Sequence, residues 1–200
     1  MKDYKKIAEE KMTKQNHMHA VVYLVYGAII GAFTSMTFGV ATLIISGPLQ
    51  YGYSKYIIEV SEDKVGKIET LFVGINDFVR YMILGILRGI FIFLWSLLFI
   101  IPGIIKAFSY SMAYYIMIDD PKIEGSEAIT KSMELMKGHK MELFNIYLSF
   151  ILKILLGLVT LCIYFLWLMP TLELAKYEFY LDLVGKSKKK TEVIDGTVVD

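Results

Sequence analysis

Six charged residues lie inside long apolar stretches of this chain, where a charge needs either a partner or a function. They are Arg88, Lys106, Lys153, Glu173, Lys176 and Glu178. If these stretches cross a membrane, each charge costs about 2.5–3.5 kcal/mol at mid-bilayer on insertion scales. Lys106 and Glu173 each follow a proline closely, and Gln50 follows Pro48. Proline frees backbone carbonyls, and interrupted helices that meet at mid-membrane form many transport sites, so we expect these three residues at similar depth.

Two of these polar residues are followed by tyrosines on the same predicted helix face. Lys106 is followed at helical spacing by Tyr110 and Tyr114, and Glu173 is followed by Tyr177. Residues four apart lie on the same face of a helix. The pattern predicts a pair between Lys106 and Glu173 that is lined by tyrosine hydroxyls.

Two interpretations of this constellation stay open. In the first it binds a ligand, and the excess of positive charge favours an anionic lipid headgroup or a small anionic solute. The residues of this ligand-binding hypothesis are Gln50, Arg88, Lys106, Tyr110, Tyr114, Glu173 and Tyr177. In the second the charges form structural ion pairs, while Arg88 and Lys176 extend their long side chains toward an interface.

A second candidate site is a cluster of cations after a predicted surface helix. Lys137, His139 and Lys140 follow one another closely, and the C-terminus of a helix favours positive charge. These side chains suit the phosphate of a lipid headgroup. The alternative is an ordinary helix end at the membrane interface.

Motifs for metal, cofactor or enzyme chemistry are not found in the sequence. Cys162 is the only cysteine, so His17 and His19 are expected to be interfacial residues rather than metal ligands. We find no glycine-rich phosphate loop, zinc-ligand spacing or nucleophile elbow. The sequence therefore predicts a non-enzymatic protein without a cofactor.

The apolar stretches themselves define the class of protein. From Ala20 to Ser54 the chain has 35 residues without Asp, Glu, Lys or Arg. As a helix this segment would be about 50 Å long, which exceeds one crossing of a ~30 Å hydrocarbon core. The chain is 56% hydrophobic with a mean hydropathy of +0.52. These values predict an all-α membrane protein, and a net charge of +1 gives no electrostatic reason to expect nucleic-acid binding.

Four polar segments separate the apolar stretches and suggest the topology. All of them contain Lys or Arg, and short basic loops stay in the cytoplasm. Each apolar stretch must then cross twice, which predicts six transmembrane helices arranged as three hairpins, with both termini cytoplasmic. The polar segments are 1–19, 59–80, 119–142 and 184–200.

Each apolar stretch contains one proline, and helix length argues that it lies inside the returning helix. A turn at the proline would leave a return helix too short to span, so the turns are expected near Gly39, Trp95–Ser96 and Thr160–Cys162. Each return helix is then kinked at its proline. The predicted spans are 20–38, 40–58, 76–94, 97–118, 142–160 and 162–183.

Residues 1–184 are predicted to form a single polytopic membrane domain. It begins with a cytoplasmic helix at 1–19 and includes an amphipathic interfacial helix at about 122–138, capped by Asp119-Asp120-Pro121. Residues 185–200 are predicted to be a polar, mobile cytoplasmic tail. Gly27 and Gly31 form a small-residue face that suits a homo-oligomer or a membrane-protein partner.

The chain resembles a family of bacterial integral membrane proteins catalogued as domain of unknown function 975. The resemblance is carried by the run Trp95–Tyr115, which contains Ile-Ile-Pro-Gly, and by Asp120-Pro121. It continues through Glu127-Ala-Ile, Ser132, Met136-Lys-Gly-His-Lys, Leu143-Phe144 and Leu148-Ser-Phe. The family is also distantly similar to the membrane domain of some glycerophosphodiester phosphodiesterases. The resemblance implies a multi-pass protein of the bacterial plasma membrane, without an established activity.

The sequence thus predicts an integral membrane protein that binds or moves a lipid or small anionic solute at an intramembrane polar patch. The lipid bilayer, with anionic lipid in particular, is the expected partner. The alternative is an accessory or regulatory module for another membrane protein.

Overall fold

The structure, a computed structural model, describes residues 3–13, 18–36, 40–98, 100–151, 153–155 and 164–186, and these residues form helices and turns without a strand. The elements are α1 (Tyr4–Thr13), α2 (Met18–Met36), α3 (Val40–Ser61), the 3₁₀ helix η1 (Ile68–Ile75), α4 (Phe78–Leu98), α5 (Ile100–Ser109), α6 (Ala113–Asp119), α7 (Gly125–Leu135), α8 (Lys140–Ser149) and α10 (Phe165–Leu183). The all-helical class is confirmed. The arrangement as six membrane spans stays a prediction.

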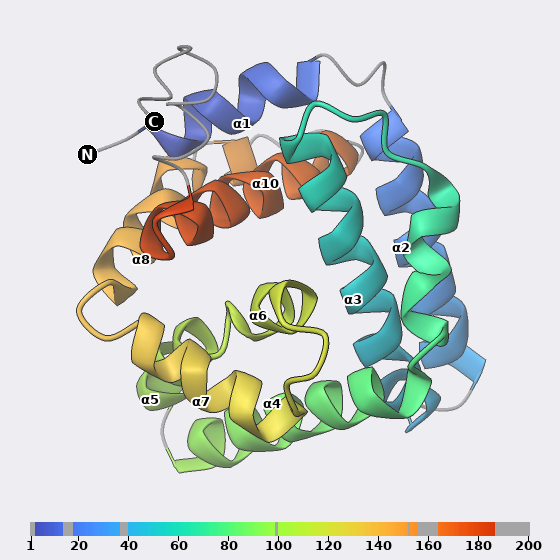
Figure 1. The fold of residues 1–200 in the computed structure, drawn as a ribbon, viewed down its shortest axis with the longest axis vertical. Coiled ribbons are helices and arrows are strands. Elements are labelled where there is room, and N and C mark those ends of the chain that lie inside the picture. The colour runs from blue at the N-terminus through green and yellow to red at the C-terminus, as the bar shows by residue number, and fades with distance from the viewer. Residues whose placement is uncertain are drawn as a thin grey trace, which may run out of the picture.

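Helix α3 is the element around which the others are arranged. It runs beside α2, while α4 lies across one of its ends and α10 across the other (Figure 1). The predicted spans 20–38 and 40–58 agree closely with α2 and α3. The predicted turn near Gly39 lies outside the described residues.

Glycines allow α3 to approach its neighbours backbone to backbone. A Cβ atom on Gly47 would lie 2.1 Å from the carbonyl oxygen of Tyr81 in α4. A Cβ atom on Gly74 in η1 would lie 2.1 Å from the carbonyl oxygen of Pro48. No side chain fits at either position, so small residues fix how closely α4 and η1 pack on α3.

The second predicted hairpin differs from the structure. Trp95 and Ser96 lie within α4, which continues to Leu98, so the turn predicted there is wrong. The predicted return span 97–118 is two helices, α5 and α6. Pro102 is the third residue of α5 and lies in the first turn, where backbone amides have no partner within the helix, so it introduces no kink there.

The break between α5 and α6 has a chemical cause on another helix. The hydroxyl of Ser132 in α7 donates to the carbonyl of Ser109 at 2.7 Å and accepts from the amide of Met112 at 3.2 Å. A side chain thus replaces backbone partners at the interruption. Sequence reasoning assigned the interruption to proline, whereas Ser132 satisfies it.

The amphipathic helix α7 is shorter than predicted and faces the protein. Pro121 does not begin it: Asp120 Oδ1 accepts a hydrogen bond from the amide of Lys122 at 3.1 Å, and the helix starts at Gly125. Its apolar face, with Ile129 fully buried, packs against α4 and α6. This face is covered by the protein itself, and the placement of the helix at a membrane interface stays a prediction.

The third hairpin is also interrupted. The predicted span 142–160 contains α8, which ends at Ser149, and helical residues at 153–155. The predicted span 162–183 agrees with α10, which contains Pro170. The predicted turn at 160–162 lies outside the described residues, as does the tail from residue 187 onward. The predicted N-terminal helix 1–19 is α1 alone, because His19 belongs to α2.

Burial divides the helices into two regions. Residues 113–117 of α6 and 174–181 of α10 are buried, and we call the tyrosine-rich region around them the tyrosine core. Residues 31–35 of α2 and 93–97 of α4 are exposed, although most of them are apolar. We call these stretches the exposed hairpin ends. Apolar helix surface left uncovered in this way suits contact with lipid.

Candidate functional site

Four of the six charges within the apolar stretches are used structurally. Glu173 pairs with Lys176 one turn along α10, and it accepts a hydrogen bond from the Tyr115 hydroxyl at 2.8 Å. The Lys176 ammonium also lies 5.4 Å from the centre of the Tyr115 ring. Lys176 is only 6% exposed, so the prediction that it extends to an interface is wrong.

The N-terminal helix satisfies two more charges. Lys11 of α1 pairs with Glu178 and donates to the carbonyl of Ser61 at 2.9 Å, and the Ser61 hydroxyl donates to Glu178 at 2.6 Å. Lys153 pairs with Glu9 of α1 at 2.6 Å, beside α10. Helix α1 therefore joins the end of α3 to α10 and to the segment after α8.

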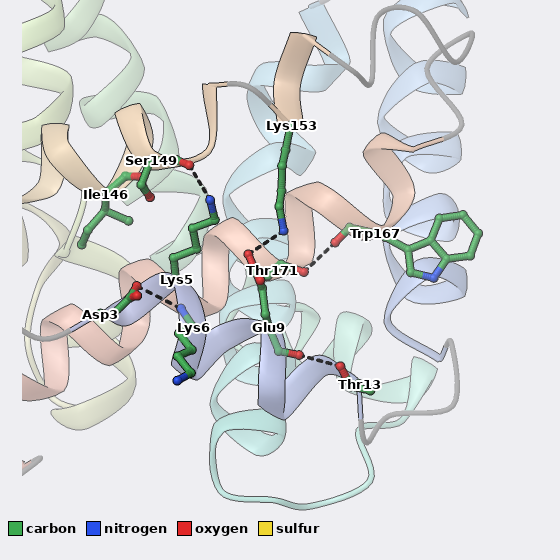
Figure 2. A network of polar contacts seen from close by, with 10 residues as sticks. All are labelled: Asp3, Lys5, Lys6, Glu9, Thr13, Ile146, Ser149, Lys153, Trp167 and Thr171. Carbon is green, nitrogen blue, oxygen red and sulfur yellow. Dashed lines mark hydrogen bonds and ion pairs between the residues drawn. The ribbon is translucent and has the colours of Figure 1, made fainter.

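Figure 2 shows how the polar side chains of α1 reach these neighbours. Lys5 donates to the carbonyl of Ser149 at the end of α8, at 2.7 Å. Tyr4 donates to Asp182 at 2.8 Å and packs edge-on against Phe179 of α10. Tyr4 lies outside the predicted spans, and burial together with the hydrogen bond to Asp182 raises the pKa of the Tyr4 phenol well above its usual value.

The predicted pair between Lys106 and Glu173 is not present. The Lys106 ammonium lies 4.6 Å from the centre of the Trp95 ring, a cation–π contact between α5 and α4. In the described part of the chain no carboxylate lies within ion-pair distance of Lys106, and Glu173 is occupied by Lys176 and Tyr115. The tyrosines predicted to line that pair separate as well: Tyr110 packs near Phe91, and Tyr177 lies between Tyr115 and Tyr180.

Arg88 has a different environment from the other charges. It is the eleventh residue of α4, near the middle of that helix. Its guanidinium lies 5.5 Å from the centre of the Tyr114 ring, and its Nε is buried without a hydrogen-bond partner. Among the described residues no carboxylate pairs with it. A buried guanidinium donor left unpaired is costly, which makes Arg88 the residue whose presence most needs an explanation.

Arg88 lines a cavity of about 220 Å³ between α2, α3, α4 and α6. The lining residues are Tyr26, Ser46, Gln50, Gly85, Arg88, Gly89, Ile92 and Tyr114. Three of them, Gln50, Arg88 and Tyr114, belong to the set predicted from sequence. The structure brings these three together and leaves Lys106, Tyr110, Glu173 and Tyr177 elsewhere.

The cavity offers hydrogen-bond donors. The Tyr26 hydroxyl donates to Oε1 of Gln50 at 2.8 Å, which occupies the amide oxygen and leaves the amide N–H₂ group of Gln50 to donate. Arg88 adds its guanidinium group, and Tyr114 contributes a hydroxyl. A fixed cation among donors, with no carboxylate among the described lining residues, is suited to an anion.

Sequence reasoning missed Tyr26 and Ser46. Both lie in an uncharged stretch, so the search for intramembrane charges passed over them. Tyr26 also belongs to a second group of aromatic rings, since its ring lies 5.1 Å from that of Tyr53 and 6.3 Å from that of Tyr23. The signal that was available is spacing: Tyr23 and Tyr26 are three residues apart on one helix face.

The predicted headgroup cluster is only partly assembled. Gly138 adopts a left-handed backbone with φ of +81°, which turns the chain between α7 and α8. Lys137 precedes this turn, whereas Lys140 is the first residue of α8 and lies at a helix N-terminus, where the dipole disfavours a cation. His139 lies 3.0 Å from Glu142. The three cations therefore do not share one helix end.

Two of the described helices are long and apolar enough to cross a membrane. They contain the segments Met18–Ser35 and Phe78–Leu97, and only 17% and 11% of these segments are buried. A core helix of a soluble protein would be mostly buried, so these segments support a membrane location. The class is an all-helical protein with membrane-type helices.

Comparison with known proteins names the family. Residues 99–187 match the family model described as "Protein of unknown function (DUF975)", which confirms the recognition from sequence over this part of the chain. The match begins at α5 and does not include Arg88 or Gln50. No curated protein and no solved structure matches the chain significantly, and similarity to glycerophosphodiester phosphodiesterases is not shown.

Proposed function

We propose that this chain is a multi-pass protein of the bacterial plasma membrane that binds an anionic group, from a lipid or a small solute, in the Arg88 cavity. The observation that carries the proposal is Arg88, which lies in the middle of an apolar helix, lines a cavity with other polar side chains and has an Nε that is buried without a hydrogen-bond partner. An intramembrane cation that has no carboxylate partner among the described residues is retained where a ligand supplies the negative charge. Binding rather than catalysis is the proposed role.

The proposed topology has six spans and cytoplasmic termini. It is supported by the basic polar segments and by the exposed apolar ends of α2 and α4. The broken elements α5 with α6, and α8 with the segment after it, then cross as interrupted helices, with interruptions that are buried in the protein.

Cysteine labelling tests this topology. The chain offers a clean background, because Cys162→Ser removes its only cysteine. Lys131→Cys places a thiol on the exposed face of α7, beside Glu127. We expect a membrane-impermeant maleimide to label this thiol only in permeabilised cells. Labelling in intact cells would place α7 outside and contradict the topology.

A second candidate function is that of an accessory module for another membrane protein. One observation favours it: Gly27 and Gly31 lie on an exposed face of α2, with no atom within 4 Å of a Cβ built on either. Such a face permits close approach of a helix from a second protein or a second copy. Cross-linking through cysteines at Gly27 and Gly31 tests it.

Anion binding is tested with a matched pair of variants, one at an arginine and one at a lysine. Arg88→Gln and Lys106→Gln each remove one positive charge from the same hairpin, but only Arg88 lines the cavity. The protein is released from nanodiscs that contain phosphatidylglycerol, with inorganic phosphate added, and is observed by native mass spectrometry. We expect wild type and Lys106→Gln to retain an anionic adduct. Arg88→Gln should retain about ten-fold less of this adduct. Equal retention by all three would contradict the proposal.

A further inference from the structure

The Arg88 cavity is open toward one side, between α2 and α4. Both helices pack on α3 but make little contact with each other, so they flank a cleft whose floor is α3. Tyr26 of α2, Gln50 of α3, Arg88 of α4 and Tyr114 of α6 all line it.

Gly89 forms the rim of this cleft on α4. It is exposed, and no atom lies within 4 Å of a Cβ built there. This contrasts with Gly47 and Gly85, whose neighbours α4 and α3 leave no room for a side chain. Gly89 is therefore not needed for packing, and its missing side chain leaves access to the cavity open.

The surroundings of this opening are apolar. Ile90 and Phe93 of α4 are 47% and 66% exposed, and Leu43 of α3 is 60% exposed. A molecule that enters here has a polar group at Arg88 and apolar surface beside it. The cavity of about 220 Å³ holds a small polar group, since pockets for whole drug-sized molecules are about 300–1,000 Å³.

Charge and donor geometry narrow the ligand class further. Arg88 is the single cation among the described residues of the cavity lining, so a ligand with one negative charge is matched and a doubly charged one is not. A phosphomonoester or free phosphate carries about −1.5 to −2 at neutral pH. Donors also approach from three helices, α3, α4 and α6, which suits a tetrahedral anion with several oxygens, and a guanidinium matches phosphate geometry well.

We infer that the ligand is the phosphodiester of a phospholipid, which enters from the bilayer between α2 and α4, past Gly89, and leaves its acyl chains outside against the exposed apolar side chains. This inference rests on the proposed anion site and specifies its ligand and its direction of access. The same diester chemistry also occurs in a water-soluble molecule, glycerophosphoglycerol, which the experiment uses to separate the two sources.

The test combines two glycine variants with three probes. Gly89→Leu fills the rim, and Gly31→Leu adds the same side chain at another open, exposed helical glycine outside the cavity. Replacing a helical glycine also favours the helix, so both variants are expected to fold. Native mass spectrometry measures retained phosphatidylglycerol, glycerophosphoglycerol and inorganic phosphate for these variants, wild type and Arg88→Gln.

We expect Gly89→Leu to retain at least ten-fold less phosphatidylglycerol than wild type, while its binding of glycerophosphoglycerol stays within two-fold. Gly31→Leu should behave as wild type with both. Undiminished phosphatidylglycerol on Gly89→Leu, or a preference of wild type for inorganic phosphate, would overturn the lipid inference while Arg88-dependent anion binding still stood. If no anion binds in a way that depends on Arg88, the proposed function is overturned as well.

Discussion

The tyrosine core and the Arg88 cavity differ in how charges within apolar stretches are paired. In the core, Glu173 pairs with Lys176, and Glu178 pairs with Lys11 of α1. In the cavity, Arg88 has no carboxylate partner among the described residues, and its Nε makes no hydrogen bond. Paired charges in the core hold helices together, whereas the charge in the cavity is the one for which we propose a ligand from outside the chain.

The largest expected effect comes from breaking the buried pair of the core. Lys176→Met leaves Glu173 without its partner in a buried site, and such a change costs about 3–5 kcal/mol. Thermal unfolding in detergent should show a large loss of stability. The double variant Glu173→Gln with Lys176→Met should recover most of it. If the double variant is as unstable as the single one, the pair is not what stabilises this region.

An intermediate effect is expected at the break between α5 and α6. Ser132→Ala removes the hydroxyl that bonds both Ser109 and Met112 and leaves buried backbone groups unsatisfied. We expect a loss of about 1–3 kcal/mol in the free energy of unfolding. Faster hydrogen exchange at residues 109–113 should accompany it. Ser126→Ala, on the exposed side of the same helix, provides the control.

A smaller effect, with a characteristic pH dependence, is expected for the attachment of α1. Because burial and Asp182 raise the pKa of Tyr4 in the folded state, its contribution is fully present below the unfolded pKa of about 10. This contribution to stability is lost as the pH rises further, because the Tyr4 phenol then ionises in the unfolded chain but not in the folded protein. Tyr4→Phe should lose about 1 kcal/mol at pH 8 and show a weaker decline above pH 10. An identical alkaline decline in both proteins would contradict this assignment.

The smallest effect on stability is expected at Arg88, in contrast to the core. Arg88→Gln removes a charge that has no carboxylate partner among the described residues, so the free energy of unfolding in lipid-free detergent should stay nearly the same or rise slightly. In phosphatidylglycerol, wild type should gain stability over the variant, because a ligand that binds the folded state stabilises it. Equal stability gains for the two proteins would remove this contrast between the regions.

The sequence predicts the elements of this protein better than their contacts. Uncharged length located α2 and α3 closely, because hydrophobic length constrains a helix strongly. The same criterion gave one helix at 97–118, where the structure has two. The break between α5 and α6 depends on Ser132, a residue distant in sequence. Spacing from prolines suggested a partner for Lys106, but Glu173 has a nearer cation one turn away at Lys176. The sequence predicted part of the cavity lining, namely Gln50 and Arg88. It missed Tyr26, because the search looked for charges and Tyr26 carries none.

The most direct test measures the distance between arginine nitrogen and phospholipid phosphorus. The chain contains two arginines, and Arg80 is occupied by the carbonyls of Pro121 and Ile123. With ¹⁵N-arginine protein in phosphatidylglycerol bilayers, solid-state NMR should show ³¹P dephasing of a guanidinium signal. We predict that Arg80→Lys keeps this dephasing and Arg88→Gln abolishes it. Dephasing that is absent in wild type, or unchanged in Arg88→Gln, would contradict a lipid phosphodiester bound at Arg88.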